Sequence, residues 1–463
     1  MRQLLFGTLL GLLVATAVAA PADARTFTVR EAMTEAVLAS DAVAAATAKT
    51  DQELAKADAA LLMFFPSATL TGGYARLDTT PYTEMTMDIR EMLPEELLEN
   101  ELFGQYFEDL EPVTQQIEFG RVDNLQFQLQ AEQIIFAGTA LHRQRAMAVA
   151  QVRSAREEER VARHEAAMNA EKTFWQLALA RESIAVTDAA IETAESHIAV
   201  LESFVEVGMA STSDMMAAKV QLASLKFERL RARQTADLAE NAFRMWVHVP
   251  DGEPIELDLD HDTLPLALSD DRGEVVDLAR DSRPELKMLG HQHDAVRHGA
   301  GAAWSSWLPS LAFRANVYLK NPDRANEPNF YWSGDLTIGL QWKLWDRGAA
   351  LTANRQARAG MRQVEAFRRQ LSDGVSLEID QAMSQRREAA EQMEVAGEAV
   401  ALAQESLRLA ELNLGEGMAR NVDVLEAQTQ LSKAQLDQIM AETSYHLAEA
   451  TLRKAVGLDL EDW

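Results

Sequence analysis

Two acidic residues near the end of the sequence have a spacing at which carboxylates could act together. Asp423 and Glu426 follow a glycine turn in the stretch EGMARNVDVLEAQ, residues 416–428. On a helix, residues three apart lie on one face. If several copies of this face met, the carboxylates would raise one another's pKa and favour bound cations. A single copy would be a solvated pair in a first helical turn, where negative charge is favoured electrostatically. Taken alone, the spacing favours this second interpretation.

The same turn occurs twice in the chain. A related stretch, VGMASTSDMMAAKVQ, spans residues 207–221, and its Asp214 lies 209 positions before the first of those two carboxylates. Gly208 and Gly417 also lie 209 positions apart, and glycine permits the sharp turn at which a helix reverses. The sequence therefore predicts two equivalent reversals, each followed by an acidic residue.

The segments around both turns have the pattern of long helices. No glycine or proline interrupts residues 139–207, and such a run in a polar protein is helical, with a length on the order of 100 Å at 1.5 Å per residue. Apolar residues recur every seven positions, which predicts coiled-coil packing. We expect helical hairpins at about 139–248 and 348–456. The heptad residues are Leu177, Ile184, Ile191, Ile198 and Val205 in the first half and Met393, Val400, Leu407 and Leu414 in the second.

Ahead of each predicted hairpin, apolar and polar residues alternate. The alternation predicts strands at about 66–76 and 122–135, and again at about 309–320 and 331–345. Strands of this length and pattern are typical of membrane barrels, although a half-buried hairpin of a soluble domain is the alternative. Five of the eight tryptophans favour the membrane, because they bracket or occupy the second strand pair as an interfacial girdle would. They are Trp304, Trp307, Trp332, Trp342 and Trp345.

The remaining segments complete a duplicated plan. Residues 1–24 have the charge, apolar run and small-residue end of a secretory signal peptide. The first structural repeat spans 25–249 and the second 272–463. Between them, residues 250–271 are rich in Pro and Asp and predict an irregular connector.

Composition excludes several functions. The net charge of −28 argues against nucleic acid as a partner, because phosphates would be repelled. The chain has no cysteine, so it has no disulfide and no lipid-modified N-terminal cysteine. No phosphate-binding loop, clustered histidines or catalytic triad indicates an enzyme or a cofactor.

Four membrane strands cannot form a closed sheet by themselves. An open sheet in lipid leaves two edges whose backbone groups are unpaired, at several kcal/mol each. The chain must therefore oligomerise: two copies would give a narrow, plugged barrel, and three would give twelve strands around a lumen.

The sequence resembles TolC-like outer-membrane efflux proteins of the non-acylated branch. The phrases RPEL and LPSL, at 283–286 and 308–311, the duplicated strand-and-hairpin plan and the two turns carry the resemblance. It implies a mixed α and transmembrane β fold, in which a homotrimer forms a twelve-stranded β-barrel joined to an α-helical periplasmic tunnel. Such proteins are passive exit ducts in the outer membrane of Gram-negative bacteria. They serve tripartite efflux or type I secretion through a periplasmic adaptor (membrane fusion) protein and an inner-membrane pump of the RND, ABC or MFS type.

The resemblance also assigns roles to the turns. It implies that Asp423 and Glu426 line a narrow periplasmic aperture, with Asp214 in the matching position of the first repeat. We hypothesise that Arg420 pairs with Asp214 and holds this aperture closed. The residues that would contact the adaptor are Val207, Gly208, Met209 and Ala210 in the first turn and Gly417, Met418 and Ala419 in the second.

Other features leave alternatives open. His291, His293 and His298 are close in sequence, but scattered surface positions are a better interpretation than a metal site. Residues 84–118 form an acidic insert in the first strand pair, with an amphipathic helix expected at 94–110, and predict an external cap or a cation-bridged lipid contact. A periplasmic adaptor or an exported coiled coil without a pore remains the alternative function, although an adaptor would have one hairpin rather than two.

Overall fold

The computed structural model of the protein describes residues 25–95, 110–118, 120–208, 210–250, 252–259, 268–323 and 327–458. The predicted signal peptide and most of the predicted amphipathic helix at 94–110 lie outside these ranges. The chain divides into two compact units. One comprises Met1–Gln52, Val152–Gln292 and Val364–Trp463, and the other comprises Glu53–Gln151 and His293–Gln363.

Each half of the chain contains the same helices in the same order. A helix of 11 residues and one of 22 residues come first: α1 and α2, Val29–Ala39 and Asp41–Leu62, in the first repeat, and α7 and α8, Arg272–Ser282 and Pro284–Ser305, in the second. No pattern in the sequence had predicted these helices. Their equal lengths extend the duplication beyond the hairpins.

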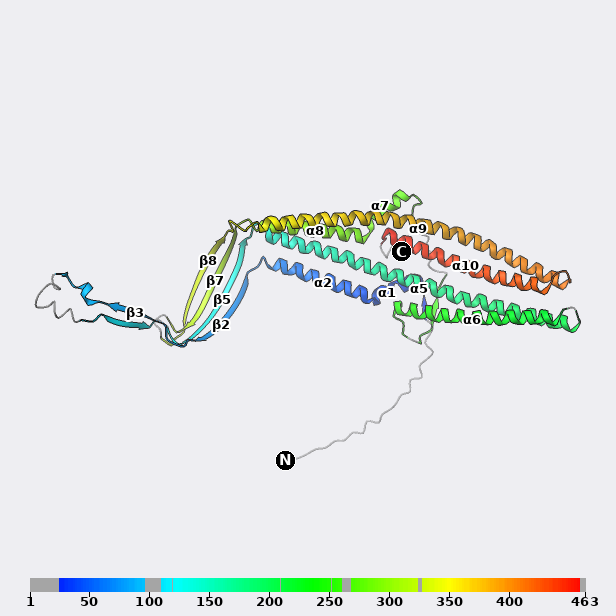
Figure 1. Ribbon diagram of the computed structural model, residues 1–463, viewed down its shortest axis with the longest axis horizontal. Coiled ribbons are helices and arrows are strands. Elements are labelled where there is room, and N and C mark those ends of the chain that lie inside the picture. Colours follow the sequence, from blue (N-terminus) through cyan, green and yellow to red (C-terminus); the bar gives the residue numbers. More distant parts are fainter. Residues whose placement is uncertain are drawn as a thin grey trace, which may run out of the picture. The chain divides into compact units, whose positions relative to one another are not determined.

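The long helices follow in both repeats. The first hairpin consists of α5, Ala140–Glu206, and α6, Thr212–Val247. The second consists of α9, Ala349–Gly415, and α10, Asn421–Val456. Both outgoing helices have 67 residues and both returning helices have 36. Figure 1 shows each returning helix running back along its outgoing partner.

The heptad seams pack inside these hairpins. Ile191 of α5 contacts Leu225 of α6 in one buried cluster, and Leu407 of α9 packs with Val424 of α10 in another. Each repeat also has one larger buried cluster that forms its core. Phe27, Phe174 and Phe243 centre the first, and Val375, Ile379 and Leu452 centre the second. The seven-residue periodicity thus marks the residues that join each hairpin.

One antiparallel sheet contains the four long strands. They are β2 (Ser67–Arg76), β5 (Asp123–Phe136), β7 (Ser310–Asn321) and β8 (Tyr331–Gln341), in that spatial order. The sheet joins the two repeats, because β5 pairs with β7. In the described part of the chain, β2 and β8 each pair with one neighbouring strand, so each leaves an open edge.

One face of this sheet is apolar. The register aligns Leu70 with Leu129, and Leu129 with Val317, across three strands. On β8, Leu336 and Ile338 are 76% and 67% exposed. An unburied row of large apolar side chains across a sheet is the pattern of a surface that faces lipid.

The opposite face carries a polar network. Gln128 donates to Asn316 Oδ1 over 3.3 Å, and Asn316 donates to Asp335 Oδ2 over 2.9 Å. Arg314 Nη2 lies 3.1 Å from Glu132 Oε1 on the adjacent strand. Hydrogen bonds therefore connect side chains across β5, β7 and β8 on this face.

Tryptophans lie at both ends of the β7–β8 pair. Trp307 precedes β7, donates its Nε1–H to Asp346 over 3.1 Å and stacks on Trp304 at 5.4 Å between ring centroids. Trp342 follows β8 and donates to the Trp307 carbonyl over 3.1 Å. Trp332 lies at the other end, where β8 begins. Both ends of the pair thus carry the aromatic residues expected of membrane interfaces.

Two connecting segments differ from expectation. The segment expected to be an irregular connector contains β6, Ile255–Leu257, which pairs in parallel with β1, Arg25–Phe27. The acidic insert contains a second antiparallel pair, β3 (Tyr82–Met87) with β4 (Val113–Glu118), and a short 3-10 helix, η1 (Ile89–Met92). Both strands are exposed along their whole length, so burial gave the sequence no periodic pattern there. Among the described residues, no helix combines the length and the apolar character needed to span a bilayer.

Candidate aperture and docking site at the hairpin tips

Glycine makes both turns possible for the same reason. Gly208 and Gly417 have φ of +78° and +71°, a conformation that side chains with a Cβ rarely adopt. The N–H of Gly208 donates to the carbonyl of Val205 over 3.1 Å, and that of Gly417 to the carbonyl of Leu414 over 3.0 Å. An added Cβ at either glycine would meet no atom within 4 Å. The backbone conformation, rather than lack of space, therefore demands glycine.

The first turn leads into a capped helix. Ser211 Oγ accepts from the backbone N–H of Asp214 over 3.2 Å, and Asp214 Oδ2 accepts from the backbone N–H of Ser211 over 3.1 Å. The Ser211 hydroxyl also donates to the Asp214 carboxylate over 2.6 Å. These bonds, the hydroxyl first and then the backbone N–H, lower the pKa of Asp214. Asp214 is thus the third residue of α6 and completes the capping box with Ser211.

In the second turn, Arg420 replaces the capping serine. Asp423 Oδ2 accepts from the Arg420 backbone N–H over 2.8 Å, and Asp423 Oδ1 from its guanidinium over 3.1 Å. Within one chain Arg420 therefore pairs with Asp423 and not with Asp214, and a pairing of Arg420 with Asp214 across the assembled aperture stays a prediction. Each aspartate is bonded to the residue three positions before it, because that partner is already within reach.

The two candidate aperture carboxylates lie in different surroundings. Asp423 is half-buried and its pKa is lowered, first by the Arg420 backbone N–H and then by the guanidinium. Glu426, one turn further along α10, is exposed. Within one chain the pKa of Asp423 therefore moves opposite to the direction expected for a ring of like charges. Such rings need several copies and remain a prediction.

Both turns present apolar side chains to solvent. Val207 is 69% exposed and Met418 is 74% exposed. Ala210 and Ala419 lie half-buried behind them. Met209, the remaining predicted contact, lies outside the described residues. A surface with exposed Val and Met beside small residues could accept a partner helix closely.

A buried polar contact that sequence reasoning missed joins the two tips. Nε2 of His197 on α5 lies 2.7 Å from Oδ1 of Asn421 on α10, and Asn421 Nδ2 donates to the carbonyl of Asp214 over 3.1 Å. His197 is 8% exposed and Asn421 is 6% exposed. Asn421 thus connects both helices of the first hairpin to the start of α10. A histidine and an asparagine 224 positions apart carry no local signal.

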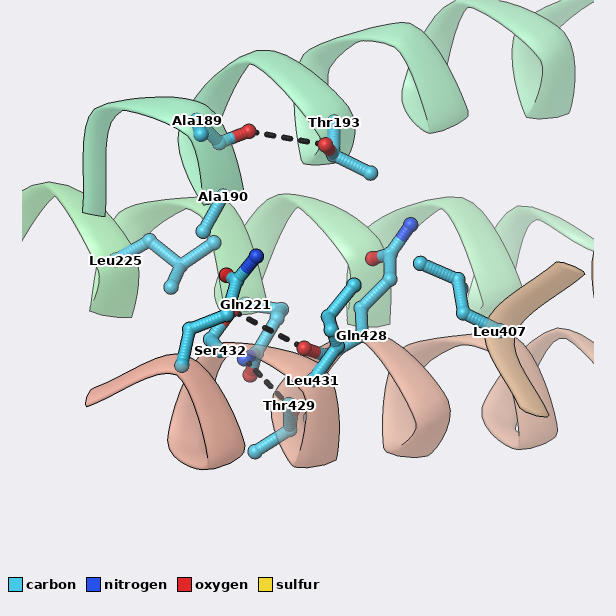
Figure 2. Close-up of a pocket in the computed structure, with 11 residues that line it drawn as sticks. Ala189, Ala190, Thr193, Gln221, Leu225, Leu407, Gln428, Thr429, Leu431 and Ser432 are labelled. Atoms are coloured by element: carbon cyan, nitrogen blue, oxygen red, sulfur yellow. Dashed lines mark hydrogen bonds between the residues drawn. The ribbon is translucent and has the colours of Figure 1, made fainter. Parts of the chain in front are cut away.

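Further from the tips, a small cavity separates the hairpins. Figure 2 shows its walls, and its volume is about 80 Å³. Gln221 of α6 donates to Thr429 of α10 over 3.2 Å beside it. Gln428 extends from α10 toward the first hairpin, and its Nε2 has no hydrogen-bond partner in the described structure. The lining residues are Ala189, Ala190, Thr193, Gln221, Leu225, Leu407, Gln428, Thr429, Leu431, Ser432 and Gln435.

Histidines elsewhere do not gather. His291, His293 and His298 all lie on α8. Across the part of the chain that the structure describes, no group of three or more His, Asp or Glu side chains is placed to hold a metal ion.

Comparisons with known proteins identify the family. The family model described as outer membrane efflux protein matches residues 32–245 and 275–458. Among solved structures, a crystal structure of CusC has a TM-score of 0.73 at 15% identity, covering 93% of this chain and 92% of that chain. VceC from Vibrio cholerae has a TM-score of 0.69 at 16% identity, covering 93% and 96% respectively. The open state of MtrE from Neisseria gonorrhoeae has a TM-score of 0.72 at 14% identity, covering 93% and 89%. No curated protein matches the sequence significantly.

The family match settles the resemblance. It covers both repeats and so confirms the TolC-like assignment, whereas the solved structures, at these low identities, show a shared fold. The adaptor alternative is not favoured, because the duplicated strands and hairpins together match a channel family. The chain belongs to the outer membrane efflux protein family, and it lies in the outer membrane with its helical hairpins in the periplasm.

Proposed function

We propose that three copies of this chain form a twelve-stranded barrel joined to a helical tunnel, and that this duct lets cargo leave the cell passively. It would be the exit component of a tripartite efflux or type I secretion system, with no catalytic step of its own. The open sheet carries the proposal: β2 and β8 have unpaired edges in a sheet with one apolar and one polar face.

Closure follows from the chemistry of the two faces. The row of Leu70, Leu129 and Val317 favours hydrocarbon, but the unpaired backbone groups of the sheet edges cannot be left in it. Pairing β8 of one copy with β2 of the next satisfies both edges at once. The network around Asn316 and Asp335 then faces the lumen, where water can solvate it.

The hairpin tips are the proposed contact with a periplasmic adaptor, which would connect the duct to an inner-membrane pump. Val207 and Met418 supply exposed apolar contacts, and Gly208 and Gly417 keep the turns narrow. The two turns have nearly the same backbone geometry, so one adaptor hairpin could use either. The pump, rather than the duct, would select the cargo.

The proposed gate is the acidic aperture. In a trimer, Asp423 and Glu426 would form two stacked rings of three carboxylates, and Asp214 would add a third acidic position close by. Arg420 offsets part of the charge of Asp423, while Glu426 is exposed. The rings would therefore attract cations mainly through Glu426.

Planar lipid bilayers test this function. We expect purified protein to insert and give discrete single-channel steps of low conductance, limited by the aperture. A truncation of both tips, which replaces residues 200–222 and 409–431 with short Gly-Ser turns, should raise the conductance several-fold. Protein that inserts without conducting in either form would contradict the proposal.

A further inference from the structure

The two-stranded ribbon formed by β3 and β4 has two chemically different faces. The register places Met87 opposite Val113 and, because side chains alternate between faces along a strand, Met85 lies on the same face. Neither strand alternates strictly between apolar and polar residues, so only the pairing of the two strands brings these side chains together. The face that they share, here called the apolar ribbon face, has no charged residue and consists of Thr83, Met85, Met87, Val113, Gln115 and Ile117.

The opposite face of the ribbon is polar, and its side chains bond one another. Oγ1 of Thr86 lies 3.3 Å from Oγ1 of Thr114, and Gln116 donates to Glu84 Oε1 over 3.1 Å. Both acidic residues of the two strands, Glu84 and Glu118, lie on this face. The carboxylates of the strands are therefore directed away from the apolar ribbon face, so two such faces can meet without bringing like charges together.

The apolar ribbon face is uncovered within one chain. Met85 is 51% exposed, Met87 is 48% exposed and Val113 is 55% exposed. A ribbon of two strands is only marginally stable by itself in water, and it gains stability when its apolar side packs against something else. Clustered apolar side chains on a surface also commonly mark a site of interaction. The ribbon therefore requires a partner for this face.

The chain holds the ribbon close to the rim of the sheet. The N–H of Leu77 donates to the carbonyl of Val122 over 2.7 Å, which extends the pairing of β2 with β5, and only residues 78–81 and 119–121 connect this pair to the ribbon. Because the other end of β5 leads into the periplasmic helix α5, this rim is the outer one. Each ribbon strand is about 20 Å long, and a twelve-stranded barrel with tilted strands has a radius of roughly 12 Å. A ribbon at the rim can therefore reach the barrel axis.

We propose that the three ribbons of a trimer pack against one another through their apolar ribbon faces, over the outer mouth of the barrel. The proposal rests on the proposed homotrimer and adds a second contact between its copies, outside the membrane. Short connectors keep the three faces at a high effective concentration, so burying them together costs little entropy of association. A threefold axis repeats one contact three times and closes it, which leaves no apolar ribbon face uncovered.

The charge of the segment favours copies of this chain over lipid as the occupant. Residues 84–118 contain eleven acidic residues and one base, Arg90. The guanidinium of Arg90 is already bonded to Asp88, with Nη2 lying 2.9 Å from Oδ2. An anionic lipid surface would repel such a segment, because its single base is already paired with an acid. Among identical copies the acids of the strands instead stay on the outward, polar faces.

The absence of cysteine in the chain makes a cross-linking test direct. Val113→Cys, treated on intact cells with a short bis-maleimide, should give covalent dimers on denaturing gels, because the same residue of two copies would lie close together. Thr114→Cys, the next residue and on the polar face, is the matched control and should remain largely monomeric. Adding Met87→Glu to Val113→Cys should reduce the dimers at least several-fold through repulsion between copies, whereas adding Thr86→Glu should not.

A nitroxide attached to the cysteine of Val113→Cys provides a second readout in reconstituted membranes. We expect it to be shielded both from oxygen and from a water-soluble nickel chelate, as a side chain packed between ribbons would be. Frequent collision with oxygen alone would place the face in lipid, and frequent collision with nickel would place it in water. Either result, or wild-type trimers whose Val113→Cys form gives no dimers, overturns the proposal. A protein that is monomeric in detergent and in membranes would instead refute the proposed function.

Discussion

His197 and Asn421 form a buried hydrogen-bonded contact of 2.7 Å between the first helix of one hairpin and the returning helix of the other. The contact occurs once in each chain, because the counterparts at an offset of 209 are Ser406 and Thr212. Since Asn421 also bonds the Asp214 carbonyl, one side chain at the start of α10 connects α10 to both α5 and α6. The tip of the second hairpin is thereby fixed to the first by a contact that the duplication does not repeat.

Removing this contact should loosen the aperture. Asn421→Ala leaves the buried imidazole N–H of His197 without a partner, which costs about 1–3 kcal/mol. We expect higher single-channel conductance and faster amide exchange in the first turn of α10. The counterpart change Thr212→Ala is the control and should alter neither. Equal behaviour of the two variants would show that the contact does not hold the tip.

The buried pair of Glu171 and Arg453 predicts a pH-dependent stability. Burial raises the pKa of Glu171 to about 7, although Arg453 opposes the shift, and its ordinary value is 4.5. Because the folded state holds this proton longer than the unfolded state, the free energy of unfolding should fall as pH rises from 4.5 to 7. The fall should be about 3 kcal/mol, from the size of the shift.

Thermal unfolding in detergent, followed by circular dichroism at pH 5 and pH 8, checks this prediction. Glu171→Gln should remove most of the difference between the two pH values. Asp380→Asn, at the counterpart position 171 + 209, should retain it, because Asp380 is only half-buried and pairs with Arg272. A pH difference that persists in Glu171→Gln would assign it to other groups.

The turn glycines should be intolerant of alanine for conformational reasons. Gly417→Ala forces a Cβ into the left-handed region, which costs about 1–2 kcal/mol. We expect it to destabilise the second tip and weaken adaptor binding, as measured by co-purification. Gly397→Ala, in the interior of α9 where an added Cβ meets nothing within 4 Å, should instead be neutral or stabilising by up to about 1 kcal/mol. If both changes behave alike, the left-handed conformation is not what the turn requires.

The carboxylate rings should set ion preference. Asp423→Asn combined with Glu426→Gln removes six negative charges from a trimer, so the preference for cations should fall markedly. The reversal potential in a KCl gradient measures this directly. Asp281→Asn on α7, which is exposed, is the control and should not shift it. A wild-type channel without cation preference would argue against rings at the aperture.

The sequence predicted the elements whose residues repeat at a regular period. Alternating apolar and polar residues predicted the four long strands, and apolar residues every seven positions predicted the hairpins. Both patterns arise because one face of a strand, or one seam of a helix pair, must be apolar. The strands β3 and β4 were not predicted, since they are exposed on both faces and lie in an acidic segment. The first-repeat helices α1 and α2 lack a strong heptad and were not recognised.

At the site, the sequence located the turns but not their bonds. Gly208 and Gly417 could be recognised as reversals because the preference for glycine at a positive φ depends only on the local backbone. Within one chain Arg420 pairs with Asp423 rather than with Asp214, because the Asp423 carboxylate lies only three residues away. The contact between His197 and Asn421 depends on how two hairpins pack, which no short-range pattern encodes.

The central claim is that copies of this chain close one another's sheet edges, and the stoichiometry of the detergent-purified protein tests it most directly. Native mass spectrometry should give a single species with the mass of three processed chains, and dilution should not dissociate it. A stable monomer, with β2 and β8 still unpaired, would contradict the account.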